Sequence, residues 1–77
     1  MKAKNILDTL IKQGKVSMET ETSELTIVHR VFFGTKKEFL FILNAKAIAD
    51  CKMPKTAEKK IQKFIDNGFV LSEGVFE

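Results

Sequence analysis

The segment Ala3 to Gln13 carries apolar residues at spacings of three and four, a pattern typical of an amphipathic helix. Its polar residues Lys4, Asp8 and Lys12 share the other side of that helix. Gly14 follows directly, where glycine favours a left-handed end to a helix. We therefore expect the chain to open with a helix that buries one side.

An alternating pattern, typical of strands, replaces the helical one after Gly14. Residues 16–20 form a short half-buried strand in this interpretation, and the polar stretch 19–24 supplies a turn. Residues 25–33 alternate again and are rich in β-branched and aromatic side chains. Residues 39–43 are apolar on both faces, which predicts the most buried strand. We expect a three-stranded antiparallel sheet.

Residues 44–53 predict a short helix, because Asn44 can cap it and Ala45, Ile48 and Ala49 fall at helical spacing. Pro54 suits the first turn of another helix, since its missing N–H is not needed there.

The helix from Pro54 to Asn67 has a buried stripe and then a stop at Asn67 and Gly68. The stripe consists of Ala57, Ile61, Phe64 and Ile65. Phe69 to Leu71 is a candidate fourth strand, and residues 72–74 form a turn before Val75 and Phe76.

The expected element order is α, β, β, β, α, α, β in one small α+β domain covering residues 1–77. The three-stranded antiparallel sheet, with its candidate fourth strand, packs against the N-terminal helix and the C-terminal helix. The chain has 77 residues, of which 44% are hydrophobic and 30% are charged, a composition typical of folded proteins.

The residue types that usually carry chemistry are scarce. One cysteine excludes a disulfide within the chain, and with one histidine it cannot build a Cys/His metal cage, so no metal or cofactor is expected. His29 and Cys51 are interpreted as packed side chains, and no catalytic motif accompanies them. No apolar run is long enough to span a bilayer. We expect a cytoplasmic, non-enzymatic protein without a membrane partner.

Charge placement is the main functional signal, because the net charge is only +3. The segment from Lys46 to Lys63 holds six lysines and two carboxylates, whereas acidic residues gather at residues 19–24 and toward the C-terminus. Lys55, Lys59 and Lys63 recur at every fourth position and stack along one helical stripe. The alternatives are a polyanion-binding surface and an ordinary solvated face. The expected nucleic-acid-binding residues are Lys55, Lys59, Lys60, Lys63, Lys52, Lys36, Lys37 and Arg30.

In element order and length, the run from Asn5 to Ile65 resembles a double-stranded RNA-binding domain. Residues 55–60, Lys-Thr-Ala-Glu-Lys-Lys, look like the basic helix start of that family, which implies phosphate contacts with RNA. A second resemblance covers Asn44 to Phe76, which is similar to a winged helix-turn-helix. That resemblance implies that the lysines would face a DNA major groove. We expect RNA as the ligand, with DNA as the second choice.

In size and composition the chain also resembles small phage accessory proteins that bind and disable a host factor, which implies a host protein partner. A protein-only inhibitor is the alternative to nucleic-acid binding, and the acidic stretch from Glu19 to Glu24 would be its contact. The apolar residues on both faces of residues 39–43 further predict a homodimer through the edge or the face of the sheet.

Overall fold

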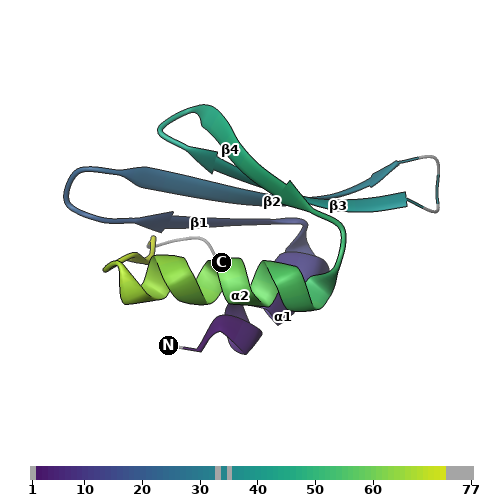
Figure 1. Ribbon diagram of the computed structural model, residues 1–77, viewed down its shortest axis with the longest axis horizontal. Helices are drawn as coiled ribbons and strands as arrows, with labels where there is room; N and C mark the ends of the chain where they lie inside the picture. Colours follow the sequence, from purple (N-terminus) through teal and green to yellow (C-terminus); the bar gives the residue numbers. More distant parts are fainter. Residues whose placement is uncertain (1, 33, 35, 73–77) are drawn as a thin grey trace.

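Two helices cover one face of a five-stranded antiparallel sheet and leave its other face open (Figure 1). The computed structural model describes residues 2–32, 34 and 36–72. The fold class is α+β, as predicted, with more strands than the sequence indicated. The strand order is β4-β3-β2-β1-β5, so the first four strands form a meander and the last joins its far edge.

The first helix, α1 (Ala3–Gln13), has the predicted bounds and buries the predicted side. It ends at Gly14, whose φ of 83° is left-handed and whose N–H donates to the Leu10 carbonyl at 2.7 Å. The Gly14 carbonyl then accepts from the N–H of His29, at 3.0 Å. The end of α1 is thereby tied to the second strand.

The predicted hairpin joins β1 (Lys15–Glu19) to β2 (Glu24–Phe32). In its turn the Thr20 hydroxyl oxygen accepts from the N–H groups of Thr22 and Ser23. β2 pairs with β3 (Lys36–Leu43) over eight residue pairs, the longest ladder of the sheet. The alternation expected for residues 25–33 is confirmed in the first part of β2, where Leu25 and Ile27 are buried beneath the helices and Thr26 and Val28 are not.

The prediction of a short helix after Asn44 is wrong, because residues 46–51 form the edge strand β4 (Lys46–Cys51). Asn44 and Ala45 both have positive φ, of 49° and 69°, and form a two-residue hairpin turn. The register shifts between Phe41 and Ile42, so that Ile48 is an extra, bulged residue. This extra residue breaks the alternation and leaves a spacing that imitates a helix.

The second long helix, α2 (Pro54–Asp66), has Pro54 at its start as predicted. It ends in a Schellman motif: the N–H of Gly68 donates to the Ile65 carbonyl and that of Phe69 to the Phe64 carbonyl, both at 3.0 Å. The Phe64 and Phe69 rings meet edge to face, with centroids 5.3 Å apart. The chain is thereby turned back toward the sheet.

The candidate fourth strand is confirmed in part as β5 (Val70–Leu71), which pairs with β1. The expectations for Phe33 and for the segment from Glu73 to Phe76 concern residues outside the described ones. Between helices and sheet lies one hydrophobic core, in which Phe39 and Phe41 are the largest fully buried side chains. α1 and α2 contact each other and form the layer drawn below the sheet in Figure 1.

Candidate nucleic-acid interface

The outer side of α2 is a row of lysines. Ala57 and Ile61 are fully buried, so the opposite side of the helix faces solvent, and Lys55, Lys59 and Lys63 are exposed there. Four residues of helix advance by about 6 Å, so the ammonium groups recur at steps of this order along the axis. None of the three forms an ion pair within the described part of the chain. We call these three residues the lysine face.

The N-terminus of α2 adds to the positive potential of the lysine face. Backbone N–H groups of the first turn give a helix N-terminus a partial positive charge, which acidic side chains commonly offset. The first turn of α2 contains no acidic residue, and Lys52 and Lys55 flank its start instead. This arrangement costs the helix some stability and favours an anion nearby.

Lys60 lies on a different side of α2, facing the edge strand. It is partly buried and lines, with Ala49, Lys63, Phe64 and Asn67, a hollow of about 240 Å³. Burial raises the pKa of the Cys51 thiol, the charge of Lys60 opposes that shift, and the charge of Asp50 adds to it. Lys60 therefore acts on Cys51, and it shares this hollow with Lys63 of the lysine face.

The end of the sheet where α2 begins carries further lysines. Phe39 pairs with Cys51, so Lys37 on β3 and Lys52, which directly follows β4, both lie just beyond that pair. The His29 ring stacks on Phe39 with centroids 4.6 Å apart. Burial, followed by the charge of Lys37, lowers the pKa of His29. Lys37 and Lys52 are both exposed and extend the basic surface past the N-terminus of α2.

The two remaining predicted residues are Lys36 and Arg30. Lys36 is the first residue of β3, and its side chain lies outside the described part of the structure. Arg30 lies on the open face of the sheet, away from the helices, where its Nη2 is 3.3 Å from Oε2 of Glu38. The structure thus separates the only arginine from the lysines.

Charge is also polarised along the molecule. The acidic turn between β1 and β2 lies at one end, whereas the start of α2 and the start of β3 lie at the other (Figure 1). Glu19, Glu21 and Glu24 are exposed at the acidic end. A polyanion would therefore be steered toward the α2 start.

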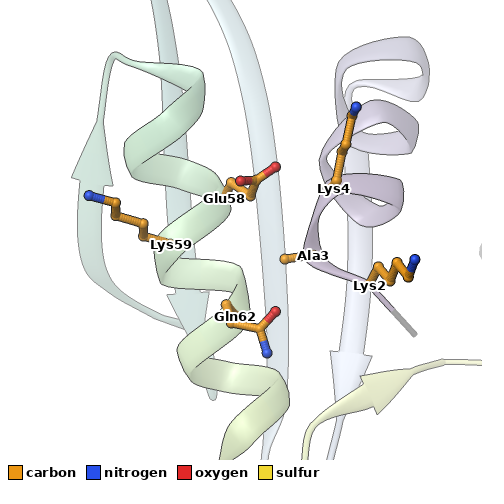
Figure 2. Close-up of a pocket in the computed structure, with 6 residues that line it drawn as sticks. All are labelled: Lys2, Ala3, Lys4, Glu58, Lys59 and Gln62. Atoms are coloured by element: carbon orange, nitrogen blue, oxygen red, sulfur yellow. The ribbon is translucent and has the colours of Figure 1, made fainter.

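A cavity of about 440 Å³ between α1 and α2 was not foreseen from the sequence. It is lined by Lys2, Ala3, Lys4, Glu58, Lys59 and Gln62. Figure 2 shows the ammonium groups of Lys2 and Lys59 directed away from the gap, whereas Glu58 and Gln62 extend into it. The Glu58 carboxylate that extends into the gap would repel a bound anion.

Among residues 2–32, 34 and 36–72, no three His, Cys, Asp or Glu side chains are grouped so that they could hold a metal ion. None of the helices in that part of the chain has the length and apolarity needed to cross a membrane. Comparison of the chain with protein-family models, curated proteins and solved structures finds no match.

The pair of helices required by the winged helix-turn-helix resemblance is not formed, because residues 46–51 are strand β4. The order expected from the double-stranded RNA-binding domain is interrupted at the same place, where β4 stands between the third strand and α2.

Proposed function

We propose that this protein is a non-enzymatic nucleic-acid-binding module that holds an RNA backbone along the lysine face of α2. The observation that carries the proposal is the row formed by Lys55, Lys59 and Lys63, three exposed cations one helical turn apart and without ion pairs in the described structure. Like charges at this spacing weaken a helix by a few tenths of a kcal/mol per pair, and bound phosphates would reverse that effect.

The expected contacts are with phosphates. Lysine is a flexible point charge that lacks the planar donor fork with which arginine reads guanine. The only arginine lies on the opposite face of the sheet, beside Glu38. Binding should therefore depend weakly on base sequence and strongly on salt. RNA is proposed ahead of DNA because residues 55–60, at the start of α2, resemble the basic helix start of double-stranded RNA-binding domains.

The test is fluorescence anisotropy with labelled single-stranded RNA, double-stranded RNA and double-stranded DNA over a series of salt concentrations. We expect affinity for RNA to fall with a log–log slope of roughly −0.7 to −0.9 per phosphate contacted. Changing Lys55, Lys59 and Lys63 together to Glu should abolish binding and leave the fold intact, since the buried side of α2 is untouched.

A matched control changes the net charge equally at three other exposed lysines, Lys4, Lys12 and Lys46. Its affinity should fall far less than that of the lysine-face variant. Equal losses in both variants would show that only net charge matters. If the lysine-face variant retained full affinity for RNA, the proposal would be overturned and the protein-only inhibitor favoured, with the acidic turn at Glu19 to Glu24 as its contact. A phage accessory role with a host protein partner stays a prediction.

A further inference from the structure

The face of the sheet that the helices leave open carries an apolar centre. The side chains of Val28, Leu40 and Ile42 point away from the core and are half-buried. The bulged Ile48 lines a hollow with Leu40 and is 48% exposed. A face of this kind commonly binds another protein surface.

Charges on this face are arranged in rows that run across the strands. The register places Lys15, Val28, Leu40 and Asp50 in one row, from β1 through β2 and β3 to β4. The row is cationic at the β1 end, apolar in the middle and anionic at the β4 end. A second row places Arg30 on β2 opposite Glu38 on β3.

In both rows the positive charge lies on the β1–β2 side and the negative charge on the β3–β4 side of a line that runs between β2 and β3. A half-turn about that line would bring each cation over an anion of an identical row, Val28 over Leu40, and Ile42 over Thr26. Interfaces in two-fold dimers require this property, because the same patch must be complementary to itself.

We propose that the open face binds a second copy of this chain, in a two-fold dimer whose axis runs parallel to the strands between β2 and β3. Lys15 then lies over the partner's Asp50, Val28 over the partner's Leu40, and Arg30 over the partner's Glu38. The two sheets stack face to face at about 10 Å, as in other aligned sheet packings. The helices form the outer layers.

The edges of the sheet are poorer surfaces for a second copy. β4 carries a bulge at Ile48 and starts with Lys46, two features that hinder strand addition at an edge. β5, at the other edge, has only two residues. The face therefore suits a second copy better than the edges do.

The test is sedimentation equilibrium of the full chain over a concentration series that reaches high micromolar. We expect a dimer that Leu40→Glu converts to a monomer. Lys15→Glu should weaken the dimer about tenfold, because the two-fold axis places two new Glu–Asp repulsions in the interface. Asp50→Lys should weaken it similarly. The double variant Lys15→Glu, Asp50→Lys should restore it, since each pair is then reversed.

Circular dichroism would show whether Leu40→Glu fails to fold. In that case the variants at Lys15 and Asp50 still test the dimer, because both residues are exposed and their replacement leaves the core unchanged. A native chain that is monomeric at high micromolar concentration would overturn the dimer. If the chain dimerises but the double variant dimerises no more tightly than the single variants, this face is not the interface. The lysine-face variant should stay dimeric, so loss of RNA binding and loss of the dimer are separate results.

Discussion

Asn44 holds the start of β2 by two hydrogen bonds to the same residue, Glu24. Its side-chain oxygen accepts from the Glu24 N–H at 2.9 Å, and its own N–H donates to the Glu24 carbonyl at 2.8 Å. Asn44 also has the positive φ of the β3–β4 turn, a conformation that asparagine tolerates better than most residues. One residue thus fixes a turn and joins it to the neighbouring strand.

Replacing Asn44 with Ala should lower the free energy of unfolding by about 1–3 kcal/mol. The change removes the acceptor of the Glu24 N–H and places a less tolerant residue in the left-handed region. Urea unfolding followed by circular dichroism measures it. Asn5→Ala, at an exposed position of α1, should leave stability unchanged or raise it slightly. Equal effects of the two substitutions would contradict this role of Asn44.

Ala45→Gly should stabilise the protein, by up to about 1 kcal/mol. Ala45 has φ of 69°, which costs an alanine roughly 1–2 kcal/mol, and glycine removes this strain at a smaller cost in unfolded-state entropy. The measurement is the same urea series. Ala47→Gly, two residues along in β4, should have the opposite sign, because its backbone is already extended. Destabilisation by Ala45→Gly would show that the turn carries no such strain.

The pKa of His29 makes stability depend on pH near neutrality. Burial and the charge of Lys37 lower its pKa in the folded state below the ordinary 6.5, so the unfolded chain binds this proton more readily. The free energy of unfolding should therefore be highest above the unfolded pKa and fall as the pH is lowered through it toward the folded pKa. Thermal unfolding between about pH 7.5 and pH 5.5 measures the trend, in a range above that in which most carboxylates titrate.

The control for that trend is His29→Gln, which has no charge to gain. Its stability should change less over the same range of pH. If stability depends on pH equally in the native chain and in the variant, the dependence comes from groups other than His29.

Lys60→Met should raise the pKa of the Cys51 thiol further, because the cation that opposes the effect of burial is removed. The rate of alkylation by iodoacetamide against pH reports this value, since the thiolate is the nucleophile and Cys51 is the only cysteine. Lys59→Met, on the outer side of α2, should leave the alkylation profile in place and weaken RNA binding more. The reverse pattern would place Lys60 with the lysine face.

The sequence indicated the two helices well because their signals are local: the stripes of α1 and α2 and the stops at Gly14 and Gly68 all survive in the structure. β4 was misassigned because one bulged residue, Ile48, gave a strand the spacing of a helix. The lysine face could be predicted from the spacing of Lys55, Lys59 and Lys63, which recur at every fourth position. The contact of Lys60 with the edge strand and the position of Arg30 on the open face could not be predicted, because they depend on which elements pack against α2 and which face of β2 is covered.

The meander also determines which contacts can form early when the chain folds. Each ladder from β1 to β4 joins strands that are consecutive in the chain, so short turns close them at a small entropic cost. Only the pairing of β5 with β1 spans most of the chain, and it requires α2 to be complete and turned back at Gly68. We therefore expect the β2–β3 hairpin to lead folding and β5 to dock last, so that native-state hydrogen exchange should find β5 opening first.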